Sequence, residues 1–255
     1  SPLPPPRKRP LQTGSAKESE LIRFLDRSFN NVQKRCDNRV THRKTTTPPP
    51  LDAQGYAAFG EAAKDIDGLV NVIWVSGSPN LQIPYLLTTA VLITEFLPLF
   101  APAPRATLDL LDKIDVAFAS LLQGRNIDTG EPLAGFEMGR TVSTTDKVRL
   151  KGIVERTRLA VVRVLAGGFD EREGRGGGGE ETDEGDTSMG EETDADAEGF
   201  VKFEGFDNDD DEGEGEGGED EEEREERRIG KVYEKTLVEL GDVLGGPPIG
   251  IITDD

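Results

Sequence analysis

Few side chains in this chain have the types and spacing that catalysis requires. Among its 255 residues, His42 is the only histidine and Cys36 the only cysteine. One histidine excludes zinc sites built on two or more histidines, and one cysteine excludes disulfides and CxxC redox or metal sites. Cys36 also falls on an apolar stripe, where a thiol packs as a small core residue. The lack of a nucleophile–base arrangement predicts a non-enzymatic protein, although chemistry by carboxylates alone stays open.

Two motifs resemble ligand-binding loops but lack the residues that such loops need. Residues 213–218 read GEGEGG and match the GxGxxG form of dinucleotide-binding loops, yet the surrounding carboxylates would repel a pyrophosphate. Residues 207–211 begin like a calcium loop, but Glu212 stands where that loop requires glycine. The sequence contains no GxxxxGK[ST] phosphate-binding loop. We therefore predict no cofactor and no metal site.

Basic side chains at two places are candidates for contact with nucleic acid. Arg7, Lys8 and Arg9 form a cluster between prolines, which has the form of a nuclear-import signal. A second group lies in the last helix predicted before the acidic part of the chain, and consists of Lys147, Arg149, Lys151, Arg156 and Arg158. Such groups suit phosphate contacts, but an ordinary solvated helix face has the same composition. No aromatic residues interleave with these charges, so stacking on single strands is not predicted.

The charge is distributed in blocks along the chain. The net charge is −20, and residues 167–226 hold 28 acidic and 4 basic side chains. This acidic tract cannot bury enough apolar surface to offset its ordering entropy, which predicts disorder. Within it, Ser188 and Thr193 are followed by acidic residues at the spacing of acid-directed phosphorylation sites. We expect the tract to bind basic partners such as histones or to mask the chain's own basic faces, with a solubilising tail as the simpler alternative.

The elements that must position these residues are predicted to be helices. Apolar residues recur at spacings of three and four in several stretches, and no pair of strands is indicated. The predicted parts are a disordered basic and proline-rich arm (1–14), an amphipathic helix (15–40), a linker (41–51), a helical core (52–166), the disordered acidic tract (167–226), a C-terminal helix that docks on the core (227–246) and a tail (247–255). The fold class is therefore all-α, a five- to six-helix bundle with a long disordered acidic insertion.

The most apolar part of the chain indicates where the core lies. Residues 81–100 are interrupted by Pro84, Glu95 and Pro98, so we interpret them as a buried helix rather than a membrane span. The side chains that we expect to be largely buried are Trp74, Leu86, Leu92, Phe96, Ile114 and Phe118. No membrane partner is predicted.

Several sequence runs resemble a family of uncharacterised helical proteins of filamentous fungi. The runs are WVSGSPNLQIPYL at 74–86, FASLLQG at 118–124, LAGFE at 133–137, DKVR at 146–149 and VYEKT at 232–236. Members of this family are often named after the meiosis-specific RecA-type recombinase. This chain lacks the Walker A motif of that recombinase and its βαβ alternation. The resemblance therefore implies an association with recombination, without strand exchange and without any site residues.

Two functions follow from these observations. The first is a non-enzymatic helical interaction protein, located in the nucleus, whose acidic tract binds basic proteins or masks its own basic faces. The second is a DNA-associated accessory factor in meiotic recombination or repair, acting through the N-terminal arm and the basic helix. A cytoplasmic scaffold is a third and weaker interpretation. The sequence leaves the oligomeric state open.

Overall fold

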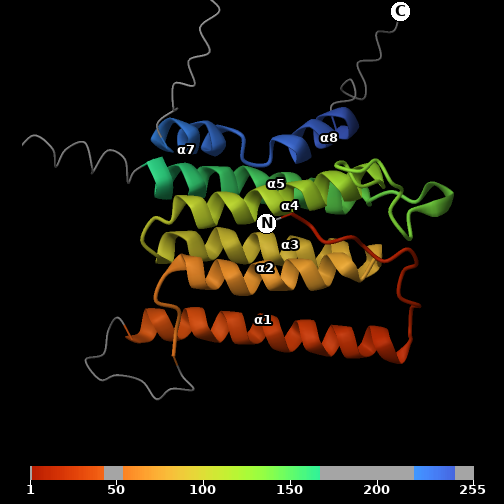
Figure 1. Ribbon diagram of the computed structural model, residues 1–255, viewed down its shortest axis with the longest axis horizontal. Helices are drawn as coiled ribbons and strands as arrows, with labels where there is room; N and C mark the ends of the chain where they lie inside the picture. Colours follow the sequence, from red (N-terminus) through yellow and green to blue (C-terminus); the bar gives the residue numbers. More distant parts are fainter. Residues whose placement is uncertain (1, 43–53, 167–220, 245–255) are drawn as a thin grey trace, which may run out of the picture.

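The computed structural model describes residues 2–42, 54–166 and 221–244, and the regular elements in these ranges are all helical (Figure 1). In chain order they are α1 (Ala16–His42), α2 (Phe59–Val75), α3 (Pro79–Phe96), the 3-10 turn η2 (Leu97–Leu99), α4 (Pro104–Gln123), the 3-10 turn η3 (Glu137–Gly139), α5 (Thr144–Val161), the π-helical turn η4 (Val162–Ala166), α7 (Glu221–Gly230) and α8 (Glu234–Leu244). The predicted all-α fold is confirmed. Outside the described residues lie positions 43–51 of the predicted linker, most of the acidic tract with Ser188 and Thr193, and the tail, whereas positions 41 and 42 belong to α1.

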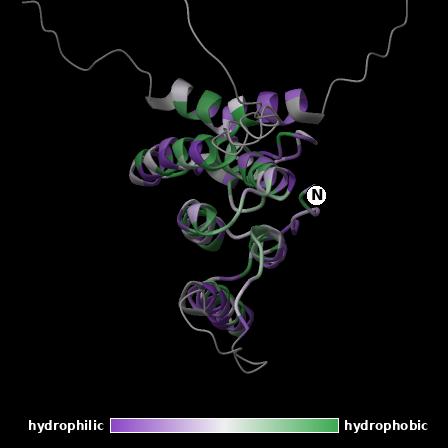
Figure 2. Ribbon diagram, turned by 90° about the vertical axis from the view of Figure 1, so that its left-hand side faces the viewer, coloured by the Kyte–Doolittle hydropathy of each residue, from purple (hydrophilic) through white to green (hydrophobic). Residues whose placement is uncertain are grey.

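The helices stack in layers from α1 at one side to α7 and α8 at the other (Figure 1). Viewed along the bundle, the layers follow one another with hydrophobic residues between them (Figure 2). The six side chains predicted to be buried have exposed fractions of 6% or less, which confirms that prediction. The core therefore runs continuously through the bundle, and α3 lies near its middle.

Helix α3 has the composition of a membrane span but the position of a core helix. Residues 79–99 are the one described stretch that is long and apolar enough to cross a bilayer. Of this stretch, 56% is buried inside the bundle. Leu86 and Ile93 are fully buried against neighbouring helices, as expected for the central helix of a bundle.

The residues just before α2 attach α1 to the bundle. The Tyr56 N–H donates to the Arg35 carbonyl at 3.2 Å, and the Tyr56 hydroxyl donates to Asp65 Oδ2 at 2.8 Å. The Arg35 guanidinium lies over the Tyr56 ring, 4.0 Å from its centroid, and pairs with Asp65 at 2.5 Å. Gly55 packs its backbone directly against α1. The second helix, α2, begins after this segment, at Phe59.

Replacing Gly55 with alanine is expected to lower the free energy of unfolding by about 1–3 kcal/mol, because overpacking forces the backbone apart. A Cβ at Gly55 would lie 2.8 Å from the Arg35 carbonyl oxygen and closer still to the Arg39 nitrogen, and both are backbone atoms. Urea unfolding measures the loss. Gly68→Ala is the control, because a Cβ at that α2 position meets nothing within 4 Å. Equal stability of Gly55→Ala and the unaltered chain would contradict this account of α1.

The N-terminal arm differs from the prediction of disorder. Residues 2–14 lie against the bundle, where Leu3 packs on the core. The Leu11 N–H donates to Ser78 Oγ at 2.9 Å, and Ser78 Oγ donates back to the Leu11 carbonyl at 3.3 Å. Prolines restrict the unfolded arm and reduce the entropy that it loses on docking. The two leucines thus hold a segment whose composition alone indicates disorder.

The C-terminal part forms two helices where the sequence predicts one over 227–246. Helix α7 ends at Gly230, and α8 begins at Glu234 after a turn in which Tyr233 takes a left-handed φ of 58°. Residues 221–226, assigned to the disordered tract from the sequence, form the first turns of α7. Both helices pack on α4, and α7 also contacts η4.

Candidate protein-interaction surfaces

Among the described residues there is neither a metal-binding cluster nor a cysteine with a lowered pKa. No group of three or more His, Cys, Asp or Glu side chains among them could hold a metal ion. Burial, with a further effect of the Asp37 charge, raises the pKa of Cys36 to about 11, so the thiol is protonated at neutral pH. His42 is the last residue of α1. The features that remain are surfaces, and the polar contacts that hold them in place.

A buried carboxylate joins α8 to α4. Asp115 accepts the N–H of Thr236 at 2.8 Å and the N–H of Lys235 at 3.2 Å, so it caps the α8 N-terminus from another helix. The Thr236 hydroxyl also donates to the Asp115 carbonyl at 3.3 Å. Burial raises the pKa of Asp115, and these hydrogen bonds oppose that shift. The turn between α7 and α8 is therefore fixed by a side chain about 120 positions earlier.

Ion pairs also connect α4 to α7 and to α2. Arg228 of α7 donates to Asp109 at 2.7 Å and to Asp112 at 2.6 Å, both on α4. Lys113 lies on the same helix with its side chain fully buried, and its Nζ is 2.6 Å from Asp67 Oδ1 of α2. The bundle thus carries charged contacts between α4 and α7 and between α4 and α2, which the helical periodicity of the sequence does not reveal.

The structure separates the five basic residues predicted on α5. Lys147 is buried, with 8% of its surface exposed. Arg158 donates to the carbonyls of Val232 at 3.1 Å and Gly230 at 3.4 Å, so it holds the turn before α8. The exposed members are Arg149, Lys151 and Arg156. Arg7, Lys8 and Arg9 of the arm are exposed as well.

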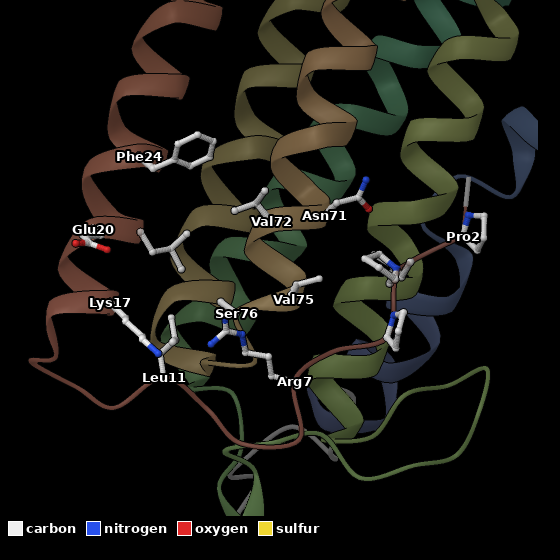
Figure 3. A pocket seen from close by; sticks show the side chains of 14 residues that line it. Pro2, Arg7, Leu11, Lys17, Glu20, Phe24, Asn71, Val72, Val75 and Ser76 are labelled. Atoms are coloured by element: carbon white, nitrogen blue, oxygen red, sulfur yellow. The ribbon is translucent and has the colours of Figure 1, made fainter.

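A groove lies between the N-terminal arm, α1 and α2, with a volume of about 980 Å³ (Figure 3). Phe24 extends over it from α1, while Val72 and Val75 line it from α2. The ring of Phe24 is 48% exposed. The charged side chains of Arg7, Lys17 and Glu20 line the groove beside these residues. Its mainly apolar lining suits contact with an apolar segment rather than with an anion.

An apolar stripe on the outer side of α5 was not found by the sequence reasoning. Val148, Leu159 and Val162 are exposed by 57%, 59% and 48%, Gly152 lies between the first two, and Val162 is the first residue of η4, which continues α5. We call these four residues the outer stripe. Their positions follow helical spacing, so the sequence contains the pattern of this stripe. The basic residues around it favour the interpretation of a phosphate-binding face instead.

Comparison with known protein families gives a match over most of the chain. Residues 55–241 match the model of the family TFB6, described as subunit 11 of the general transcription factor TFIIH. The match starts just before α2 and ends within α8, so it includes α4 and α5 with the contacts of Asp115, Arg228 and Lys113, whereas the N-terminal arm and α1 precede it. No curated protein and no solved structure matches the chain.

Proposed function

The chain belongs to the family of subunit 11 of TFIIH, and from this premise we propose that it is a nuclear, non-enzymatic accessory subunit of that factor. The observation that carries the proposal is the extent of the match, which runs from residue 55 to residue 241. It includes α2 to α5, α7 and most of α8. A subunit of this kind acts by contact with other proteins, which agrees with exposed apolar surfaces on α1 and α5.

Co-purification tests this proposal. The full chain, tagged and expressed in its own cells, is expected to elute from gel filtration with TFIIH subunits in a fixed ratio. The purified chain should also bind purified TFIIH directly. Elution of the chain by itself, together with no binding to purified TFIIH, would contradict the proposal. Binding to histones, predicted from the acidic tract, stays a prediction and is tested in the same extracts.

A role in contact with DNA is the second candidate, because one set of exposed charges favours it. Arg149, Lys151 and Arg156 are exposed on α5, and no ion pair among the described residues involves them. Duplex DNA binding of the full chain is compared with that of a chain lacking 167–220, across a series of salt concentrations. Stronger binding after the deletion, falling steeply with salt, would support phosphate contacts masked by the acidic tract. The association with recombination stays a prediction from the resemblance to the fungal family.

A further inference from the structure

Helix α5 has two apolar faces, and only one of them is used inside the bundle. Leu150, Val154 and Val161 are buried with exposed fractions of 2% or less. The outer stripe lies on the opposite side, and no described residue covers it. Three of its four members are large apolar side chains with about half of their surface in water. A second apolar face on one helix is typical of a helix that contacts a partner.

The spacing of the outer stripe fits another helix. Positions 148, 152, 155, 159 and 162 follow one another at 4, 3, 4 and 3, which is the repeat of a coiled-coil seam. This stretch rises about 21 Å along the helix. A Cβ at Gly152 would meet nothing within 4 Å, so the Cα of Gly152 is open to close approach, while Arg156 Nε donates to its carbonyl at 3.1 Å. Glu155 occupies the middle position of the seam, which leaves the apolar anchors at its two ends.

The charges beside the outer stripe indicate the chemistry of that partner. Lys151 borders the stripe on one side, and Arg149 and Arg156 border it on the other. Glu155 is the single acidic residue between Lys147 and Arg163. In coiled-coil packing the positions beside the seam form salt bridges with the facing helix and select the partner by charge. A helix with acidic residues beside its apolar seam is therefore the complement.

We propose that the outer stripe of α5 is the docking site for an amphipathic helix of another TFIIH subunit, with Glu or Asp beside its apolar seam. The identity of the assembly rests on the proposed function, whereas the chemistry of the helix rests on α5 itself. Duplex DNA fits this face less well, because phosphates gain nothing from Val148, Leu159 and Val162 at its centre.

A designed peptide tests the docking chemistry without reference to TFIIH. The probe is a helical peptide of about three heptads with Leu at the seam positions and Glu beside them, and a matched peptide carries Lys in place of Glu. Fluorescence anisotropy with the full chain should show binding of the Glu peptide only. Leu159→Asp should weaken that binding at least about tenfold, because it places a carboxylate in the apolar seam.

Two variants control this measurement. Val238→Asp changes an α8 side chain that is also 59% exposed, and it should bind the Glu peptide as the unaltered chain does. The double change Lys151→Glu with Arg156→Glu should reverse the preference toward the Lys peptide. The proposal would be overturned if Leu159→Asp bound the Glu peptide as tightly as the unaltered chain does, or if neither peptide bound. A preference of the unaltered chain for the Lys peptide would also overturn it.

Purified TFIIH then separates this inference from the proposed function. Binding of TFIIH by the full chain and its loss in Leu159→Asp would support both. Binding that Leu159→Asp leaves unchanged would overturn the docking site while the proposed function stands. No binding of TFIIH by the unaltered chain, with the peptide results intact, would overturn the assignment to TFIIH and keep the helix-docking surface.

Discussion

Replacing Asp115 with alanine is expected to lower the free energy of unfolding by about 2–5 kcal/mol, because one buried and one partly buried N–H group lose their acceptor. Those groups belong to Lys235 and Thr236 at the start of α8, and Asp115 itself is 3% exposed. The retained Thr236 hydroxyl bond to the backbone of α4 cannot replace them. We therefore expect α8 to undock before the rest of the bundle unfolds.

Hydrogen exchange measures this effect separately for each helix. In Asp115→Ala, amide protection should fall across residues 231–241 and persist in α2 and α3. The control is Asp109→Ala, which removes one of two carboxylates from a partly exposed pair with Arg228, and should cost about 0–1 kcal/mol. Unchanged protection of α8 in Asp115→Ala would show that its apolar face alone holds it on α4.

The helices and the core could be predicted from sequence because both follow local rules. Apolar side chains that recur at three and four residues must share one side of a helix, and that side becomes buried. Trp74 and Phe118 were identified in this way, and both are buried. The same rule would have placed Lys147 inside, since it lies three residues before Leu150 and seven before Val154, which are buried.

The contacts of the C-terminal helices could not be predicted in this way. Asp115 binds backbone groups 120 and 121 positions later in the chain, so no local pattern marks it as a helix cap. The arm presents the same difficulty, because Leu11 and Ser78 are 67 positions apart. In both cases a polar group finds its partner only after the helices have packed.

The surface on α5 was missed for a different physical reason. The basic side chains of α5 indicate phosphate contacts, and the exposed apolar side chains lie in the same stretch of sequence. For Arg158 the charge is a poor guide to phosphate contact, because its guanidinium donates hydrogen bonds to two backbone carbonyls of the same chain. Val148 and Leu159 indicate a partner surface, but only once the structure shows that the opposite side of α5 is buried in the bundle.

Replacing Phe118 with alanine is expected to lower the free energy of unfolding by about 3–5 kcal/mol, because the lost ring leaves a cavity that the helices fill only in part. Phe118 is 3% exposed, and its ring centroid lies 6.3 Å from that of Tyr233, so the cavity opens between α4 and the turn before α8. Urea unfolding followed by the fluorescence of Trp74, the only tryptophan, measures the loss. Phe24→Ala is the matched control, since its ring is 48% exposed and should change stability by no more than about 0.5 kcal/mol. An unfolding midpoint of Phe118→Ala equal to that of Phe24→Ala would place the ring outside the core and would contradict the docking of α8 on α4.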